Sequence, residues 1–319
     1  MTIVAGIDEA GYGPFVGPLV VAAAAYRLEQ DAKESDLDRI VRDKGVRTQG
    51  LPTADSKQLY HSGGSLTRIE TSTLGHMALA RGALPVRFDS LVKGAVDLSV
   101  TEIEDLPWYA GRILAMRLPR ASSLDDVLAR SAWHGHYLAQ RGACFEDLFL
   151  APVLVPRFNR LSAAAGSKAW TLFHTTGRLI ETLVERFHKE DLVIHVDRQG
   201  GRIHYGALLQ TFFPMAPLRT ISERRECSLY ELAWPDRSPV RIDFRVKADG
   251  RRAPVALASV AAKTLRELFM DCFNEWFTEH IDGLKPSAGY GTDGRRFVSE
   301  VLAAGPKYAK NRDLLERCR

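Results

Sequence analysis

The sequence predicts an α/β protein in which short buried strands alternate with helices. Two apolar segments, 3–7 and 19–26, are separated by a glycine-rich turn, which indicates a hairpin. Helical spacing over 168–188 leads directly into a third apolar segment, 192–197. Apolar and polar residues alternate over 239–248, which is the period of a half-buried strand. Strands and helices in this succession are typical of the α/β class.

Turn residues and prolines set the limits of the other elements. The residues 235–238 favour a turn that joins a strand at 227–234 to the alternating segment 239–248. Pro214 ends a helix because it lacks a backbone N–H, whereas Pro254 suits the first turn of a long helix. The helices not yet named are expected at 37–41, 65–80, 122–132, 205–213, 254–276 and 294–304.

The length of 319 residues exceeds the roughly 100–200 residues of a typical domain, so it permits one enlarged domain or a core with an added module. Regular patterns weaken from 89 to 165, apart from the helical spacing at 122–132. We therefore interpret 89–165 as an insertion of unknown role between two parts of one catalytic domain, 1–88 and 166–319.

Composition excludes some classes of protein. Hydrophobic residues make up 45% and charged residues 26%, as in globular proteins with a large core. The apolar run 19–26 is shorter than the roughly 20 residues that span a membrane, and no signal peptide is recognised, so we expect a cytoplasmic protein. The four cysteines lie far apart and predict neither disulfides nor a zinc site. The net charge of +4 is compatible with a polyanionic partner but does not require one.

Four acids stand where predicted strands end. Asp8 and Glu9 follow the first apolar segment, Asp197 ends the third, and Asp249 ends the alternating segment. Strand ends beside flexible turns suit catalytic groups, because the sheet fixes the side chain while the loop leaves room for substrate. If these strands are neighbours, the carboxylates repel one another and need a cation, for which oxygen-preferring Mg²⁺ and phosphodiester hydrolysis are the natural answer. For each acid taken alone, a helix cap or a partner for a nearby arginine stays open.

Several segments match, in order, the signatures of a known family. They are Gly6-Ile7-Asp8-Glu9-Ala10-Gly11-Tyr12-Gly13-Pro14 with Gly17-Pro18, Asp55-Ser56-Lys57-Gln58-Leu59, Val196-Asp197, Lys247-Ala248-Asp249 with Ala258-Ser259-Val260-Ala261-Ala262-Lys263, and Gly289-Tyr290-Gly291. This set resembles the motifs of the ribonuclease HII family and covers about the first 60 residues and about 168–305.

The resemblance implies a ribonuclease H-like mixed sheet flanked by helices, with a helical C-terminal part. It implies a metal-dependent endonuclease that cuts the RNA strand of RNA–DNA hybrids, or DNA that contains ribonucleotides, and leaves 5′-phosphate and 3′-hydroxyl ends. Two Mg²⁺ or Mn²⁺ ions would be held by Asp8, Glu9, Asp197 and Asp249. The substrate-binding residues would be Gly11, Tyr12, Gly13, Ser56, Lys57, Lys263 and Tyr290, with Lys57 at a phosphate, Lys263 close to the acids and Tyr290 stacked on a sugar.

One departure from the family pattern affects substrate choice. A tight glycine turn lets backbone groups approach a ribose 2′-hydroxyl, and Gly11 and Gly13 fit that role. The family has an arginine between these glycines, whereas this chain has Tyr12, which cannot offer a phosphate the forked charge of arginine. The related ribonuclease HIII group also lacks that arginine and favours longer hybrid tracts.

Other interpretations remain open at the level of sequence. The turn Gly11-Tyr12-Gly13 is a poor dinucleotide loop, because a strand rather than a helix is expected after it. His134 and His136 have a spacing compatible with metal binding but no evident third ligand. The chain could also be a nucleic-acid-binding protein of this fold without turnover, or a nuclease for another structured nucleic acid. No motif in the sequence indicates a protein partner, so protein partners stay unknown.

Overall fold

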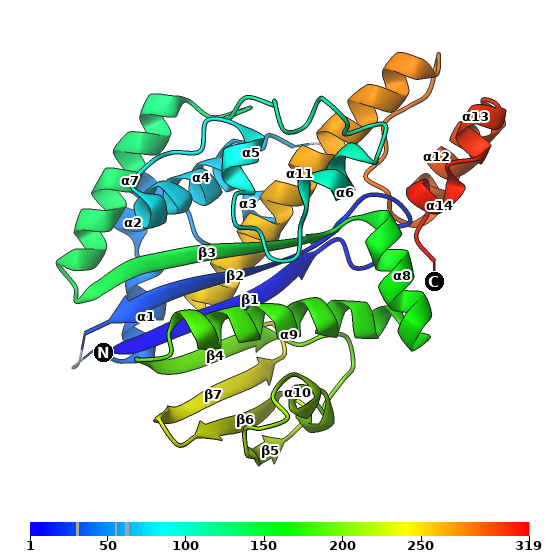
Figure 1. The fold of residues 1–319 in the computed structure, drawn as a ribbon. Coiled ribbons are helices and arrows are strands. Elements are labelled where there is room, and N and C mark those ends of the chain that lie inside the picture. The colour runs from blue at the N-terminus through cyan, green and yellow to red at the C-terminus, as the bar shows by residue number, and fades with distance from the viewer. Residues whose placement is uncertain (30–31, 55, 61–63, 319) are drawn as a thin grey trace.

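The computed structural model describes residues 1–29, 32–54, 56–60 and 64–318. A mixed seven-stranded sheet with the order β3-β2-β1-β4-β7-β6-β5 forms its centre (Figure 1). β1 is parallel to β4 and β4 to β7, and the other neighbouring pairs are antiparallel. The strands are β1 (Thr2–Ala10), β2 (Leu19–Leu28), β3 (Ala143–Val153), β4 (Asp191–Asp197), β5 (Leu218–Glu223), β6 (Cys227–Trp234) and β7 (Arg237–Arg245).

Helices cover both faces of this sheet, which confirms the predicted mixed sheet flanked by helices. Odd-numbered residues of β1, such as Ile3 and Ile7, pack with α9 (Lys168–Arg186) and α10 (Gly206–Phe212). On the opposite face, Val4 packs with α11 (Ala253–His280). The remaining helices are α1 (Glu34–Val41), α2 (Lys44–Gln49), α3 (Ser56–Leu59), α4 (Thr67–Arg81), α5 (Phe88–Leu91), α6 (Val100–Glu104), α7 (Leu124–Ala139), α8 (Val155–Ala165), α12 (Gly291–Ala303), α13 (Pro306–Ala309) and α14 (Arg312–Leu315).

A close approach of backbones fixes α11 against the strand that carries the first two acids. A Cβ atom added to Gly6 in β1 would lie 2.2 Å from the backbone nitrogen of Val255 in α11. Only glycine leaves room for this contact, and a side chain there would push the helix away from the sheet. The first turn of α11 is thereby held directly against the middle of β1, two residues before Asp8.

Two predicted elements have different limits in the structure. The alternating pattern predicts a strand to 248, but β7 ends at Arg245 and Lys247 has a φ of +53°, which is incompatible with an extended strand. Apolar positions predict the long helix to 276, whereas α11 continues to His280. Asp249 therefore lies in the turn between β7 and α11 rather than at the end of a strand.

The segment 89–165 contains more regular structure than its sequence pattern indicated. Residues 143–153 form β3, which pairs with β2 and so belongs to the same sheet. Trp108 packs against Phe273 and Phe277 of α11, with ring centroids 5.6 and 5.4 Å apart. This segment thus contributes a strand and covers the outer half of α11, and its interpretation as an insertion stays a prediction.

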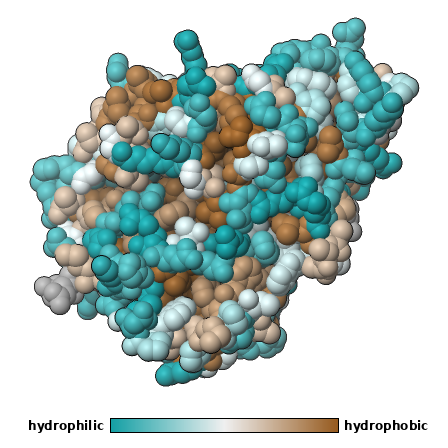
Figure 2. Space-filling view, in the orientation of Figure 1, coloured by the Kyte–Doolittle hydropathy of each residue, from teal (hydrophilic) through white to brown (hydrophobic). Residues whose placement is uncertain are grey.

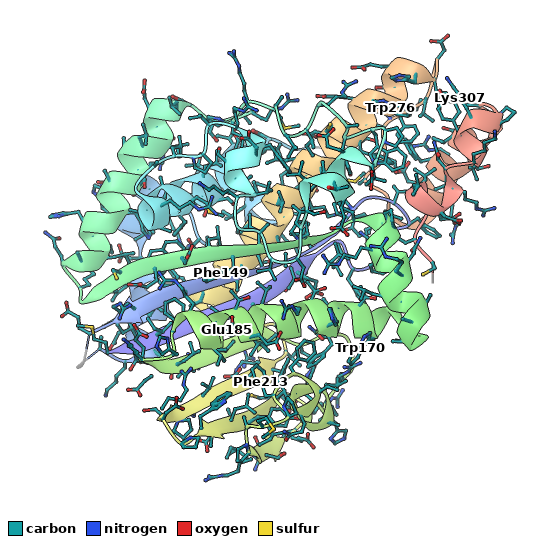
Figure 3. All side chains as sticks on the ribbon, in the orientation of Figure 1. Phe149, Trp170, Glu185, Phe213, Trp276 and Lys307 are labelled. Carbon is teal, nitrogen blue, oxygen red and sulfur yellow. The ribbon has the colours of Figure 1, made fainter. Side chains whose placement is uncertain are left out.

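The C-terminal helices α12, α13 and α14 lie beside the outer end of α11 (Figure 1). Figure 3 shows Trp276 near that end of α11 and Lys307 in α13. The ring of Trp276 contacts that of Tyr308, with centroids 6.4 Å apart. This arrangement confirms the predicted helical C-terminal part.

The surface in the orientation of Figure 1 is mostly hydrophilic, with hydrophobic side chains gathered over the upper end of α7 (Figure 2). Leu124 and Leu128, in the first two turns of α7, are 43% and 44% exposed. Among the described residues, no helix combines the length and the apolar character needed to cross a membrane.

Candidate active site

Two of the predicted acids lie side by side because their strands are parallel neighbours. Ile7 of β1 pairs with Val196 of β4, so Asp8 and Asp197 each stand one residue beyond the last pair of the register. Parallel strands present their carboxyl ends at the same edge of a sheet. Glu9 follows Asp8 in β1, and the backbone N–H of Glu9 donates to Oδ1 of Asp8 at 2.7 Å.

The turn that carries Asp249 is tied to the same edge by hydrogen bonds. The backbone N–H of Ala248 donates to Oδ1 of Asp197 at 2.7 Å. The guanidinium of Arg42, the residue that follows α1, donates to the carbonyl oxygens of Asp249 at 2.9 Å and of Gly250 at 2.7 Å. The structure therefore brings acids from three separate segments to one end of β1, β4 and β7.

These acids act on one another electrostatically. Burial, together with the charges of Glu9 and Asp197, raises the pKa of Asp8 well above its ordinary value. Burial and the charge of Asp197 raise the pKa of Glu9 to about 7, and Asp249 contributes in the same direction. Burial raises the pKa of Asp197 to about 6, and the charge of Asp249 adds to the shift. Such shifts arise where carboxylates share a buried site, because burial and neighbouring negative charges both disfavour the ionised form.

The chemistry of these donors fits a hard divalent cation. Carboxylate oxygens are the ligands preferred by Mg²⁺ and Mn²⁺. A cation would offset both the burial and the repulsion that raise the pKa values of Asp8, Glu9 and Asp197. Within the part of the chain that the structure describes, no three His, Cys, Asp or Glu side chains already form a group that could hold a metal ion.

A serine that sequence reasoning left without a role supports the first acid. The side chain of Ser259 in α11 hydrogen-bonds Asp8 and lowers its pKa, against the effect of burial. Its hydroxyl also lies 3.0 Å from that of Ser56, one of the predicted substrate-binding residues. Ser259 is 5% exposed on an otherwise apolar part of α11, and a buried polar residue in such a place was the signal available in the sequence.

The two predicted lysines have different surroundings. The charge of Lys57 in α3 lowers the pKa of Asp197, which places this lysine near the acids. Lys263 in α11 instead forms an ion pair of 2.7 Å with Glu267, one turn further along the helix. The hydroxyl of Tyr60 donates to the same carboxylate at 2.9 Å. Asp55, the first residue of the predicted loop, lies outside the described residues.

The glycine-rich turn follows the acids directly. Gly11 has a φ of +81° and Gly17 a φ of +78°, backbone conformations that side chains rarely adopt. A Cβ atom at Gly13 would meet no atom within 4 Å, so this glycine faces open space. The turn therefore combines a fixed backbone with room for a ligand beside Glu9.

Tyr12 lies between the acids and two basic side chains. The Nζ atom of Lys168, the first residue of α9, is 5.2 Å from the centroid of the Tyr12 ring. Burial and the charge of Glu9 raise the pKa of Tyr12, whereas the charge of Arg202 lowers it. Tyr290, immediately before α12, is 42% exposed, and the guanidinium of Arg266 lies 5.4 Å from its ring centroid.

Comparisons with known proteins find matches among solved structures, at low sequence identity. No family model and no curated protein matches the chain. A structure of the PCNA:RNase HII complex from Archaeoglobus fulgidus matches with 16% identity and a TM-score of 0.46, covering 95% of this chain and 88% of that one. Ribonuclease H2 from Pyrococcus horikoshii OT3 matches with 15% identity and a TM-score of 0.42, covering 98% and 97%. Bst-RNase HIII in complex with Mn²⁺ matches with 13% identity and a TM-score of 0.44, covering 99% and 66%.

Proposed function

We propose that this protein is a divalent-metal-dependent endonuclease that hydrolyses the RNA strand of RNA–DNA hybrids. The observation that carries the proposal is the meeting of Asp8, Glu9 and Asp197 at one sheet edge, where burial and mutual repulsion raise the pKa values of these three acids. Asp249 lies beside them and its charge acts on Glu9 and Asp197. Clustered carboxylates of this kind serve as ligands for a pair of cations in phosphodiester hydrolysis. Bound Mg²⁺ or Mn²⁺ would supply positive charge that stabilises the phosphodiester under attack by water, leaving 5′-phosphate and 3′-hydroxyl ends.

The protein residues of the site would orient the reacting groups. Ser259 holds Asp8, and the backbone of Ala248 holds Asp197, so both acids have fixed orientations before substrate binds. Lys57, whose charge already acts on Asp197, is suited to binding a phosphate close to the acids.

Basic residues beside Tyr12 extend the site toward the nucleic-acid backbone. Lys168 and Arg202 both act on Tyr12 and come from different segments, the start of α9 and the loop after β4. Cations at these positions can bind phosphates that flank the scissile one. They place positive charge next to the turn, where Tyr12 itself supplies none.

The glycine-rich turn would give the protein its preference for RNA over DNA. A 2′-hydroxyl distinguishes RNA from DNA, and only an uncrowded backbone can approach it closely. The backbone at Gly13, two residues after Gly11, is uncrowded because a Cβ atom there would meet no atom within 4 Å. We expect the protein to prefer RNA–DNA hybrid tracts, because Tyr12 does not provide the charged fork of an arginine.

The test is a cleavage panel with three end-labelled duplexes: an RNA–DNA hybrid, a DNA duplex with a single ribonucleotide, and a DNA duplex. Wild type with Mg²⁺ or Mn²⁺ should cut the hybrid, and Asp197→Asn should not. Asp191→Asn, at the exposed opposite end of β4, is the matched control and should cut like wild type. Tight binding of the hybrid by wild type without any cutting would refute the proposed activity.

A further inference from the structure

A buried arginine close to the C-terminal end of the sequence binds the glycine-rich turn 11–18 from the protein interior. Arg317 is 3% exposed. Its Nη1 donates to the carbonyl oxygen of Gly11 at 2.5 Å, and its Nε and Nη2 donate to that of Gly17 at 2.8 and 2.5 Å. Its backbone N–H donates to the carbonyl oxygen of Phe15 at 2.8 Å. One residue therefore contacts the turn at three points, 300 and more positions away along the chain.

A second arginine repeats this arrangement. Arg266 of α11 is fully buried and donates to the carbonyl oxygens of Pro18 and Ala288, both at 2.9 Å. In the described part of the chain, neither Arg266 nor Arg317 forms an ion pair with a carboxylate. Buried charge without an opposite charge is unfavourable, and an apolar side chain of similar size would usually pack at lower cost. The hydrogen bonds to backbone carbonyl oxygens are therefore the interactions that compensate for burying these two guanidiniums.

The hydrogen bond to Gly11 determines the direction of the next N–H. In a planar trans peptide the carbonyl and N–H groups point to opposite sides. Because the Gly11 carbonyl faces Arg317 in the interior, the N–H of Tyr12 faces the opposite side of the turn. No hydrogen bond from this N–H to another residue is found in the described ranges. It is therefore available to a ligand, next to the open space at Gly13.

Arg317 is itself held by α8. The side-chain amide of Asn159 donates to the carbonyl oxygens of Asp313 at 3.1 Å and Glu316 at 2.9 Å, and its oxygen accepts from the N–H of Cys318 at 2.8 Å. The ring of Phe158 lies 4.7 Å from the Arg317 guanidinium carbon. The segment 312–318 is thus attached on both sides of Arg317, which allows the guanidinium to act as a fixed support.

We propose that Arg317 is a positioning residue for ribose recognition: it fixes the turn 11–18 so that the Tyr12 N–H donates to the 2′-hydroxyl of the RNA strand beside Glu9. This inference rests on the proposed nuclease function and adds a residue outside every matched motif. Loss of Arg317 should weaken discrimination between ribose and deoxyribose and leave cation binding by the acids intact.

The variants are Arg317→Met, which keeps the apolar volume, and Arg317→Lys, which keeps the charge. The matched control is Arg312→Gln, which removes a cation that is 62% exposed in the same segment. Thermal unfolding shows whether each variant is folded, and calorimetry with Mn²⁺ alone reports on the acids. Steady-state cleavage of the hybrid, and its binding relative to DNA duplex of the same sequence, report on the turn.

We expect Arg317→Met to lower kcat/KM for the hybrid about tenfold or more, through KM, and to reduce the preference for hybrid over DNA. Mn²⁺ affinity should stay within about twofold of wild type, and Arg317→Lys should recover part of the loss. If Arg317→Met does not fold, the test is whether Arg317→Lys has a lower preference for hybrid over DNA than wild type. Folded variants that keep the wild-type preference for hybrid over DNA would overturn the inference. So would folded variants in which Mn²⁺ affinity and cleavage of every substrate fall in parallel. Neither outcome would affect the proposed function, provided that wild type cuts the hybrid. Wild type that cuts no substrate would instead refute that function.

Discussion

Asp271, which is not one of the acids of the candidate site, should make the stability of the protein depend on pH. Burial raises the pKa of this side chain in α11 to about 6, from an ordinary value of 3.8. The nearby charges of Glu267, Glu275 and Glu70 act in the same direction, whereas Arg120 opposes them. We expect Asp271→Asn to stabilise the folded protein at neutral pH, because it removes a charge that burial disfavours.

The sign and size of the effect follow from proton linkage. Between pH 4 and 6 the folded state binds the proton of Asp271 more tightly than the unfolded state, so stability falls as pH rises through this window. The shift from 3.8 to about 6 corresponds to about 3 kcal/mol at most. Asp271 is partly exposed, so solvent screening reduces the expected gain at pH 8 to about 1–2 kcal/mol.

Urea unfolding at a series of pH values between 4 and 8 measures this effect. Wild type and Asp271→Asn should have similar free energies of unfolding at pH 4 and should diverge as pH rises. The same change at Asp282, an exposed acid after α11, controls for the loss of one negative charge. A constant difference between wild type and Asp271→Asn at every pH would show that the reasoning from burial is wrong.

The remaining predictions concern the site. Asp197→Asn should lower hybrid cleavage by about 10³-fold or more in single-turnover assays, and a residual rate near wild type would exclude this acid from catalysis. Ser259→Ala should lower the rate about tenfold, since a hydrogen bond to a charged group contributes about 1.5–3 kcal/mol; unchanged rates would contradict its support of Asp8. Lys168→Ala with Arg202→Ala should weaken hybrid and DNA binding alike and reduce the slope of log affinity against log salt by about 2, measured by fluorescence anisotropy. Because the pKa of Glu9 is raised to about 7, Mn²⁺ affinity by calorimetry should increase as pH rises from 6 to 8, and a pH-independent affinity would argue against cation binding there.

The parts of the fold that sequence could predict are those with strong local patterns. β1 and β4 contain apolar runs that lead into acids, and α9 has clear helical spacing, so their positions were expected. β3 was not expected, because Glu146 and Asp147 interrupt its apolar pattern and it lies at an edge of the sheet. Its pairing with β2 is a contact between distant segments that no local pattern encodes.

The candidate site shows the same division. Asp8, Glu9 and Asp197 stand out because they lie at the ends of buried strands, and Asp249 stands out because it lies in the turn after β7. The arginines that bind the backbone of the site do not stand out in the sequence. Arg42 donates to the carbonyl oxygen of Asp249, and Arg317 donates to that of Gly11. An arginine bound to carbonyl groups has no sequence signature, because any residue can supply the carbonyl. Only the folded chain reveals these contacts.

The parallel order of β1, β4 and β7 has a consequence for unfolding of the chain. Each of these strands, with the turn that follows it, carries only some of the four acids. Well over one hundred residues of chain lie between Glu9 and Asp197. A denatured chain therefore presents isolated carboxylates with little affinity for a cation, whereas the assembled sheet presents them together. By mass action, millimolar Mn²⁺ should raise the melting temperature of wild type, and this increase should vanish in any variant whose acids no longer hold the ion.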